Sequence, residues 1–330
     1  MNMIKNTSVV IVTYNHQDFI ENCLKSVFRH KDLEVVVVDN NSQDETADLV
    51  EKGFPEVKLI KNVNSGYGAG VNLGIKNSSR KYVVVLNPDT KVEENSIEEL
   101  LKPLIESFKL ITTPKILCYN GSKINTCGNN THFTGLAFTR GLGLDPKELK
   151  KPGFVNGISG ACFAIKKEDY WKIGGFNEEF FVYMEDTEFS WRAKTEGFKI
   201  GYVPSSIVYH DYTLKVSPKK LYYLEKGRYI ILREYLTHKE LLRILPSLLM
   251  SEILTWGYAI LTGFEGVKFK FKAIKDARKV EVEKNTNGFC LIELMDPEIP
   301  KDQLSFSRLD KMIRRFANKI YRMDYRRIKK

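Results

Sequence analysis

Short runs of apolar, mostly β-branched residues alternate with segments of helical periodicity along the first third of the chain. The apolar runs predict buried strands at residues 8–14, 33–39, 57–61, 81–87 and 110–117. Apolar positions three and four apart predict helices at residues 19–30, 42–52, 70–77 and 95–108, the second opened by a capping box of Ser42 and Glu45. This alternation predicts an α/β fold with a mostly parallel central sheet and helices on both faces.

The pattern weakens in the middle of the chain and changes character after it. Residues 118–151 are rich in Gly and Asn and predict long connections with at most a short hairpin. Regular patterning resumes at residues 155–165 and continues to Tyr209. We therefore expect one domain at residues 1–214 and a mainly helical extension at residues 215–330.

Polar or small residues follow the carboxyl ends of the first four predicted strands. They are Thr13 and Asn15 after the first, Asp39 after the second, Asn64, Gly66 and Gly68 after the third, and Asn87 and Asp89 after the fourth. Each alone is an ordinary turn residue. Open α/β sheets bind ligands at these strand ends, so the four together favour a polar ligand.

The side chains at these ends suit a nucleotide carrying phosphates. Asp39 can accept a hydrogen bond from the imide N–H of a pyrimidine, and small residues before a helix suit a phosphate or a sugar hydroxyl. Asp89 suits Mg²⁺ or Mn²⁺ bridging to a diphosphate. The glycines match neither GxGxxG nor a P-loop, which argues against a dinucleotide-binding or P-loop protein.

A second group of candidates lies between Gly160 and His210. Glu185, Asp186 and Glu188 precede or open a predicted helix. They either complement the helix dipole, or one of them removes a proton from an acceptor hydroxyl as a general base. His210 follows a predicted strand and is either structural or a further metal ligand.

The charge of the chain is unevenly distributed. Net charge is +10, but residues 1–214 hold 25 Lys and Arg against 27 Asp and Glu, whereas residues 215–330 hold 26 against 14. A basic tail predicts an acidic partner, either nucleic acid or anionic lipid. Five scattered cysteines predict reduced thiols, and the start of the chain lacks the pattern of a secretory leader.

Two segments of the tail suit a membrane surface. Residues 241–264 are strongly apolar but are interrupted by Pro246 and Glu252, which favours an interfacial or buried helix over a spanning one. Near the end, apolar residues at helical spacing from Leu309 to Met323 are surrounded by Arg and Lys. This predicts a basic amphipathic helix that either binds anionic lipid or docks on the first domain.

The order of these motifs resembles glycosyltransferase family 2, whose members are inverting enzymes of the GT-A fold, and in particular its rhamnosyltransferase-like branch. The matching segments span residues 7–212 and read SVVIVTYN, VVVVDNNSQDET, NSGYGAGVN, VVLNPDT, ISGACFAI, GGFNEEFFVYMEDTEFSWRA and YVPSSIVYH. One position departs from the family pattern, because Asn87 stands where many relatives have Asp.

The resemblance implies a role for each matched residue. Asp186 is implied as the catalytic base, Gly160 and Glu185 as acceptor-site residues, and Asp89 and His210 as ligands of Mg²⁺ or Mn²⁺. The implied nucleotide- and sugar-binding residues are Thr13, Asn15, Asp39, Asn64, Gly66, Gly68 and Asn87.

The resemblance also implies substrates and a location. The donor is a TDP- or UDP-sugar, rhamnose among the candidate sugars, and the acceptor is a lipid-linked or growing glycan of polysaccharide or cell-envelope synthesis. We expect a cytoplasmic protein, peripheral on the anionic inner face of the cell membrane, with no nucleic-acid partner.

Two other classes of protein are weighed against this interpretation. A nucleic-acid-binding protein would explain the basic tail but not the acids at the strand ends, and the tail has no zinc-finger or RNP motif. A nucleotidyltransferase on a related sheet is disfavoured by the glycine-rich loop after the third strand and by the Glu185–Asp186 pair.

Overall fold

The computed structural model describes residues 3–212, 217–284, 292, 294–303 and 307–328. Its contacts divide the chain into two compact units, each described here by itself. Unit 1 comprises Met1–Asn129 and Gly141–Thr213, and unit 2 comprises Asn130–Arg140 and Leu214–Lys330. The predicted boundary after residue 214 and Cys290 lie outside the described residues.

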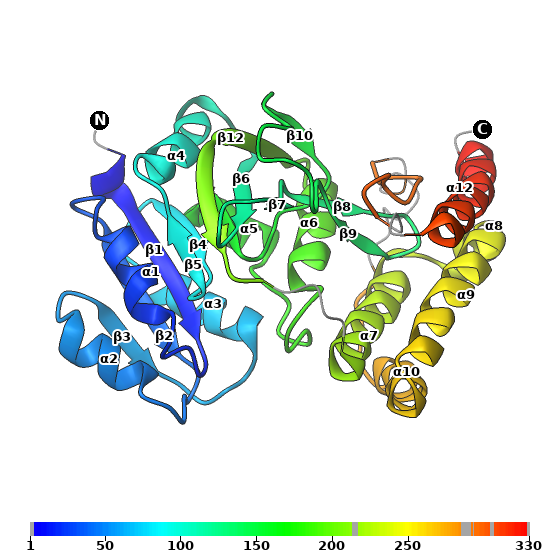
Figure 1. The fold of residues 1–330 in the computed structure, drawn as a ribbon, viewed down its shortest axis with the longest axis horizontal. Coiled ribbons are helices and arrows are strands. Elements are labelled where there is room, and N and C mark those ends of the chain that lie inside the picture. The colour runs from blue at the N-terminus through cyan, green and yellow to red at the C-terminus, as the bar shows by residue number, and fades with distance from the viewer. Residues whose placement is uncertain (1–2, 213–216, 285–291, 293, 304–306, 329–330) are drawn as a thin grey trace. The chain divides into compact units, whose positions relative to one another are not determined.

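Unit 1 is built on one large sheet (Figure 1). Among the described residues its main path runs β10-β12-β6-β11-β4-β1-β2-β3, with β5 paired to β12 and β7 paired to β6. Its strands are β1 (Thr7–Thr13), β2 (Glu34–Asp39), β3 (Lys58–Lys61), β4 (Tyr82–Leu86), β5 (Thr90–Val92), β6 (Leu110–Cys118), β7 (Ile124–Thr126), β10 (Gly153–Val155), β11 (Cys162–Lys166) and β12 (Lys199–His210).

Most pairings along the main path of this sheet are parallel. The pairs β4–β1, β1–β2, β2–β3 and β6–β12 are parallel, whereas β11 is antiparallel to both β4 and β6 and β10 is antiparallel to β12. The prediction of a mostly parallel α/β sheet is therefore confirmed. Parallel pairing also places the carboxyl ends of β1, β2, β3 and β4 at one edge.

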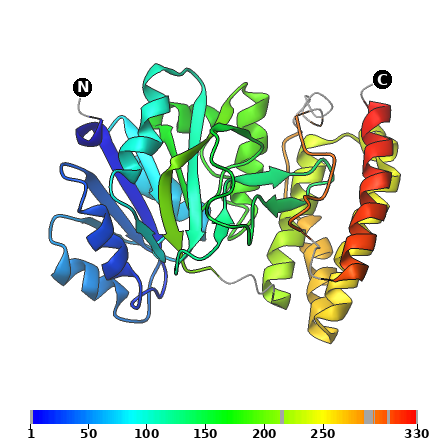
Figure 2. The same cartoon turned by 45° about the horizontal axis from the view of Figure 1, so that its top comes forward.

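Helices cover both faces of the sheet (Figure 2). Val9 and Ile11 of β1 belong to the core on one face, and Val10 and Val12 to the core on the other, as strand alternation requires. The first core includes residues of α1 (Ile20–Val27), α2 (Thr46–Gly53) and α4 (Ser96–Glu106). The second includes residues of α3 (Tyr67–Asn77), α5 (Lys167–Ile173) and α6 (Glu185–Thr195). A short 3-10 helix, Ile4–Asn6, precedes β1.

The predicted capping box of Ser42 and Glu45 is wrong. Helix α2 begins at Thr46, whose backbone N–H donates to Asp44 Oδ1 at 3.0 Å. The Ser42 hydroxyl and backbone N–H both donate to the Asp39 carboxylate instead. The charged Asp39 carboxylate at the end of β2 therefore accepts the hydrogen bonds of Ser42, which the sequence pattern assigns to the start of a helix.

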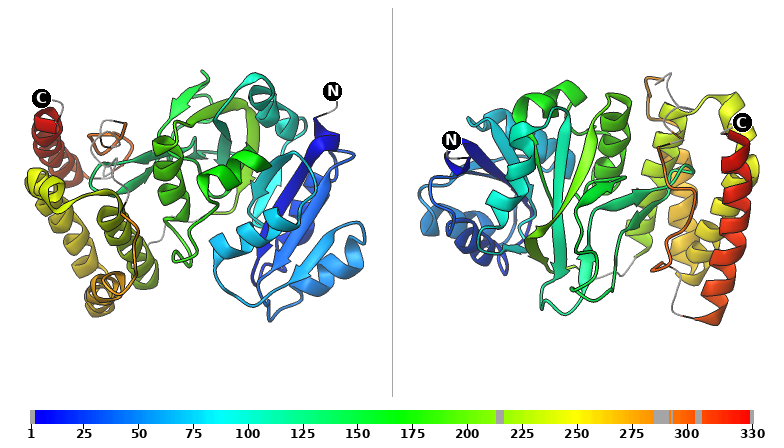
Figure 3. Two further views of the ribbon diagram at one scale, coloured as in Figure 1. Left: turned by 180° about the vertical axis from the view of Figure 1, so that it is seen from behind. Right: turned by 90° about the horizontal axis from the view of Figure 1, so that it is seen from above.

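Unit 2 consists of helices and a short two-stranded sheet (Figure 3). Its elements are β8 (Asn129–Thr131), β9 (Ala137–Thr139), α7 (Pro218–Tyr235), α8 (His238–Arg243), α9 (Leu245–Leu261), α10 (Phe264–Ala277) and α12 (Arg308–Ile328). Arg228 and Lys270 are buried, and both are paired with Glu225 and Glu252. Pairing is what makes buried charges tolerable.

The apolar segment 241–264 does not form one helix. It breaks at Ile244 between α8 and α9, with Pro246 in the first turn of α9, and α10 begins at Phe264. No helix in the described part of the chain is both long and apolar enough to cross a lipid bilayer.

Candidate active site

The ends of β1 and β2 place Thr13 beside Asp39. The two strands are in parallel register with Thr13 opposite Asp39, and both side chains are buried. Asp39 accepts from the backbone N–H of Ser42 at 3.1 Å, and the Ser42 Oγ accepts from the backbone N–H of Asn15 at 2.9 Å. The turns that follow β1 and β2 thus hold each other in place around the Asp39 carboxylate.

The loop after β3 is joined to the same strand ends. The Asn62 backbone N–H donates to the Asp39 carbonyl at 2.8 Å, and Asn40 Nδ2 donates to the Gly66 carbonyl at 3.0 Å. Within the loop, the Gly66 N–H donates to Asn64 Oδ1 at 3.2 Å. These bonds fix the path of the chain into α3.

Glycine is required at position 66 and fits closely at position 68. Gly66 has a φ of +104°, and a Cβ there would lie 2.4 Å from the carbonyl oxygen of Phe181. A Cβ at Gly68 would lie 3.2 Å from Phe176 Cβ and 3.8 Å from Glu185 Cβ. The start of α3 therefore packs directly on the loop that leads into the acidic pair.

Asp89 and His210 are brought together by strand pairing. β5 runs antiparallel to the end of β12, with His210 opposite Thr90, and the Asp211 N–H donates to the Asp89 carbonyl at 3.0 Å. As a result His210 Nε2 lies 3.2 Å from Asp89 Oδ1, and His210 Nδ1 lies 3.1 Å from Asn125 Oδ1.

This corner has acceptor atoms that suit a divalent cation. Asn87 Oδ1 is buried and has no hydrogen-bond partner among the described residues, and the buried Asp89 Oδ1 faces only the His210 ring among the contacts of the described residues. An Nδ1 proton donated to Asn125 would leave the Nε2 lone pair of a neutral His210 facing Asp89, an arrangement that a cation stabilises. Mg²⁺ and Mn²⁺ take such oxygen ligands, with phosphates supplying the rest. The residues therefore fit a metal, although no group of three His, Cys, Asp or Glu side chains that could hold one occurs in the described ranges.

The acidic pair opens helix α6. Asp186 Oδ2 accepts from the Gly160 N–H and from Asn129 Nδ2, each at 3.0 Å, and its Oδ1 accepts from the Thr187 N–H at 2.7 Å. The Tyr67 hydroxyl in turn donates to the Gly160 carbonyl at 2.7 Å. The first turn of α3, the segment before β11 and the start of α6 thus meet around one carboxylate.

Glu185 and Asp186 differ in their surroundings. Glu185 is buried and Asp186 partly buried, and removal from water raises the pKa of each. For Glu185 burial and then the charge of Asp186 raise the pKa to about 8, and its Oε2 has no hydrogen-bond partner in the described part of the chain. For Asp186 the hydrogen bonds from Gly160 and Thr187 oppose the effect of burial. The negative charge of the pair is therefore stabilised more strongly on Asp186 than on Glu185, because the hydrogen bonds to Asp186 favour its ionised form.

Tyr212 and His16 relate the corner of Asp89 and His210 to two other parts of the site, Tyr212 to Asp186 and His16 to Thr13. The ring of Tyr212 stacks on His210 with centroids 5.4 Å apart, and the pKa of Tyr212 is raised by burial and then by the charge of Asp186. On the other side, burial lowers the pKa of His16, opposed by the charge of Asp89, and His16 Nδ1 lies 3.3 Å from Thr13 Oγ1. The structure therefore brings the predicted residues together at one edge of the sheet.

Three residues at this edge were not selected from the sequence. Asn129 lies in the Asn-rich segment 118–151, where nothing in the pattern distinguishes it from its neighbours. Tyr67 stands inside the glycine-rich motif, and His16 directly follows Asn15. Their positions within two recognised motifs were the available signal for Tyr67 and His16.

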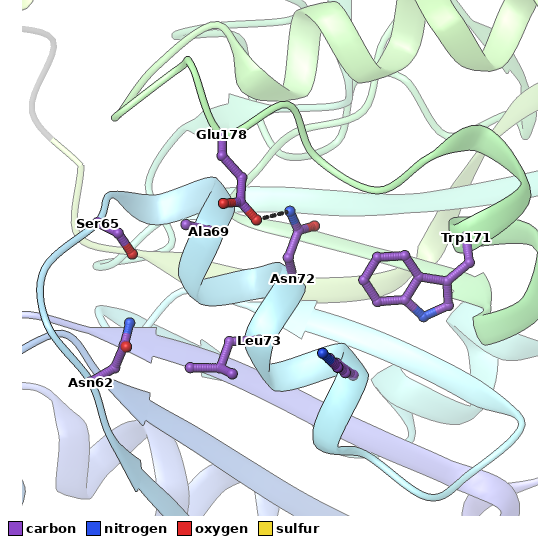
Figure 4. Close-up of a pocket in the computed structure, with 8 residues that line it drawn as sticks. Asn62, Ser65, Ala69, Asn72, Leu73, Trp171 and Glu178 are labelled. Carbon is purple, nitrogen blue, oxygen red and sulfur yellow. Dashed lines mark hydrogen bonds between the residues drawn. The ribbon is translucent and has the colours of Figure 1, made fainter.

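A cavity of about 590 Å³ lies beside α3 (Figure 4). It is lined by Asn62, Ser65, Ala69, Asn72, Leu73, Lys76, Trp171 and Glu178. Asn72 Nδ2 donates to Glu178 Oε1 at 2.9 Å across its rim. Neither Asp39, Asp89 nor Asp186 lines this cavity, so it adjoins the loop after β3 and is distinct from the acidic site.

Comparison with protein families gives two matches. The model described as glycosyl transferase family 2 matches residues 8–174, which is half of the chain. A second model, described as the N-terminal domain of galactosyltransferase, matches residues 142–215.

Among curated relatives, the chain is 31% identical over 206 residues to a low-salt glycan biosynthesis hexosyltransferase of Haloferax volcanii. That alignment covers 60% of this chain and 65% of the relative, slightly under two thirds of its length. The chain is 28% identical over 236 residues to N-acetylglucosaminyl-diphospho-decaprenol L-rhamnosyltransferase of Mycobacterium tuberculosis, covering 61% and 75%.

Solved structures share the fold at low sequence identity. GalNAc-T7 with UDP, GalNAc and Mn²⁺ has a TM-score of 0.61 at 19% identity, covering 83% of this chain and 55% of that one. S. aureus TarS 1-349 in complex with UDP-GlcNAc has a TM-score of 0.56 at 18% identity, covering 98% and 90%. At these identities the likeness establishes the fold alone.

Proposed function

Because the chain belongs to glycosyl transferase family 2, we propose that it is an inverting glycosyltransferase. It moves a sugar from a nucleoside diphosphate to a hydroxyl of a lipid-linked or growing glycan acceptor. The observation that carries the proposal is the position of Asp39, Asp89 and Asp186 at one edge of the sheet, linked by the contacts described above.

The strand ends bind the donor in this proposal. Asp39, with Thr13 and Asn15, holds the base. Asn64, Gly66, Gly68 and Asn87 contact the diphosphate or the sugar. Asp89 and His210 hold Mg²⁺ or Mn²⁺, and such a cation, when bound, neutralises charge on the departing nucleoside diphosphate.

Asp186 acts on the acceptor. Its carboxylate takes the proton from the acceptor hydroxyl while that oxygen forms a bond to the anomeric carbon and the bond from this carbon to the diphosphate breaks. One displacement inverts the anomeric configuration. Gly160 lies directly against the acidic pair, because a Cβ there would be in van der Waals contact with Asp186 Oδ2 and Glu185 Oε1, each at 3.5 Å. Glu185, whose pKa is raised to about 8 by burial and by the charge of Asp186, lies beside the acceptor in this proposal.

The relatives suggest which substrates to test first. One relative is named as a rhamnosyltransferase acting on a decaprenol-linked sugar, so we propose rhamnose as the first sugar and a polyprenyl-linked glycan as the first acceptor. Two solved neighbours contain UDP or a UDP-sugar, which places UDP-sugars beside TDP-sugars among the donors to test. The role is then the synthesis of a cell-surface polysaccharide.

We further propose that residues 1–214 form the GT-A catalytic domain and that residues 215–330 hold it peripherally on the inner face of the cell membrane. The +12 balance of the second segment suits anionic lipid.

A thermal-shift screen tests donor binding, because ligands that bind the native state raise its apparent stability. UDP-, TDP- and GDP-sugars are compared with and without Mg²⁺ or Mn²⁺. A donor that stabilises the protein only with the metal supports the proposal, and Asp89→Ala should remove that dependence. Product analysis with the same donor then decides the reaction: a released nucleoside diphosphate means glycosyl transfer, and pyrophosphate means a nucleotidyltransferase.

A further inference from the structure

Helices α9 and α12 of unit 2 contact each other through polar side chains. Ser247 donates from its N–H and from its hydroxyl to Asp324 Oδ2, at 2.9 and 2.7 Å. One turn further along, the Ser251 and Tyr321 hydroxyls are 3.0 Å apart. All four residues are buried.

Four large apolar side chains of α9 lie on the side of the helix away from this contact, while Met250 and Ala259 are buried with the serines. Leu245, Leu249, Ile253 and Ile260 recur at helical spacing and are 43%, 55%, 65% and 66% exposed. A helix in water normally buries such a stripe and exposes its serines. In α9 the arrangement is reversed, which is the pattern of helices whose surroundings are lipid.

The exposed stripe continues onto α10. The Trp256 ring of α9 contacts the Phe271 ring of α10, with centroids 4.8 Å apart, and Phe271 and Phe264 are 61% and 81% exposed. Lys268, Lys272 and Lys275 are exposed on α10, at positions next to these two phenylalanines on the helix surface. We call this the α9–α10 surface: Leu245, Leu249, Ile253, Trp256, Ile260, Phe264 and Phe271, with the three lysines.

We propose that the α9–α10 surface inserts into the headgroup boundary of an anionic lipid bilayer and holds the enzyme there. Contiguous exposed apolar surface marks an interaction site, and the adjoining lysines make anionic lipid the matching partner. Trp256 suits the boundary, because tryptophan favours the level of the headgroups. The inference rests on the proposed peripheral location and names the surface responsible for it.

Helix α12 is the alternative that the sequence suggests. Its exposed Leu309, Met312 and Phe316 form a second stripe among basic residues, also directed away from the α9–α12 contact. Because both stripes point away from the contact between the two helices, one flat bilayer meets one of them and not both. The α9 stripe is favoured because it extends over two helices and includes four aromatic or large aliphatic side chains more than 60% exposed.

Vesicle co-sedimentation of the full chain, without donor or acceptor, tests the proposal. Leu249→Gln/Ile253→Gln is compared with the matched pair Met312→Gln/Phe316→Gln on α12. On phosphatidylcholine vesicles containing phosphatidylglycerol, we expect the α9 pair to reduce the partition coefficient by at least about tenfold and the α12 pair to leave it within about twofold. Circular dichroism and thermal unfolding establish that both pairs fold.

The lysines provide a second arm of the experiment. Lys268→Gln/Lys272→Gln/Lys275→Gln should weaken binding to the phosphatidylglycerol vesicles and reduce its dependence on salt. Equal binding by both apolar pairs and the wild type, or loss only in the α12 pair, would overturn the proposal. The proposal would also be overturned if the wild type were a dimer in sedimentation velocity and Leu249→Gln/Ile253→Gln were a monomer. A second copy of the chain would then be the partner that covers the α9–α10 surface. The vesicle experiment contains no substrate. Absence of lipid binding would therefore not contradict the proposed transfer reaction, and inactivity with donor and acceptor would not contradict lipid binding.

Discussion

The two adjacent carboxyl groups at the start of α6 differ in their hydrogen bonds, and this difference supports the separate tasks that we propose for them. Asp186 is bonded by the backbone of Gly160 and Thr187 and by Asn129, whereas Glu185 Oε2 has no partner among the described residues. Hydrogen bonds to the charged form keep a buried carboxyl ionised, and their absence leaves it protonated. This difference supports our proposal that Asp186, the better bonded acid of the pair, is the general base.

This difference predicts opposite outcomes for two conservative substitutions. Asp186→Asn removes the proton acceptor and should lower kcat by about 10³-fold while donor binding is retained. Glu185→Gln replaces a protonated acid by a neutral amide of the same shape, and kcat at neutral pH should fall by less than about tenfold. Steady-state kinetics with titration of the nucleoside diphosphate measure both. Wild-type-like turnover of Asp186→Asn would remove Asp186 from the mechanism.

Because Asn129 Nδ2 donates to Asp186 Oδ2, we propose that Asn129 is a positioning residue that acts through Asp186. Asn129→Ala removes one donor to Asp186 Oδ2, so the pKa of Asp186 should rise and the acid limb of kcat/KM should move to higher pH. We expect a loss of about tenfold in kcat at neutral pH, recovered in part in more alkaline buffer. Asn120→Ala, in an exposed turn of the same segment, is the control and should leave the pH profile unchanged. A uniform loss at every pH would instead mean that Asn129 is only structural.

At the scale of elements, the entry into α3 depends on a backbone that approaches its neighbour closely. Gly66→Ala introduces a Cβ at positive φ, 2.4 Å from the Phe181 carbonyl, and should lower the free energy of unfolding by more than about 2 kcal/mol. It should also weaken donor binding, because the same loop holds Asn64. Gly53→Ala at the end of α2 is the matched control, since a Cβ there meets nothing within 4 Å. It should be neutral or slightly stabilising in urea unfolding. Equal effects of both substitutions would contradict the steric argument.

The elements themselves were largely predictable from local patterns. The apolar runs of β1, β2 and β4 and the polar residues after them follow from strand burial, and that is sufficient to place Thr13, Asp39 and Asp89 at one edge. Contacts between distant segments were not predictable in this way. The hydrogen bond from Asn129 to Asp186 joins residues 57 positions apart. The Ser42 hydroxyl donates to the Asp39 carboxylate at the end of β2 and does not cap α2.

The same limit applies to the surface of unit 2. The periodicity from Leu309 to Met323 correctly predicts α12, but a helical pattern alone implies that its apolar side is the buried one. The buried side chains are Ala317, Asn318, Tyr321 and Asp324. Which face of a helix is exposed depends on the helix that packs against it. The residues of α9 that contact α12 are Ser247 and Ser251. Local periodicity contains no information on that choice.

At the scale of the whole molecule, the acidic pair makes the stability of the fold depend on pH. The pKa of Glu185 is raised from an ordinary 4.5 to about 8 in the folded chain. Between these two values the native state binds more protons than the unfolded state, so the free energy of unfolding falls as pH rises through this window. The contribution is fully present below about pH 4.5 and lost above about pH 8.

Glu185→Gln should therefore flatten the stability profile, because an amide does not titrate. Urea unfolding of the wild type should give a free energy that decreases by a few kcal/mol, to order of magnitude, across this window, since each pKa unit corresponds to about 1.4 kcal/mol. The variant should lose most of that slope and be the more stable protein at alkaline pH. Glu56→Gln, at an exposed turn, controls for removal of a carboxylate and should retain the wild-type slope. A variant as pH-dependent as the wild type would mean that Glu185 is not the group that titrates across this window, and would contradict the assignment of the raised pKa to Glu185.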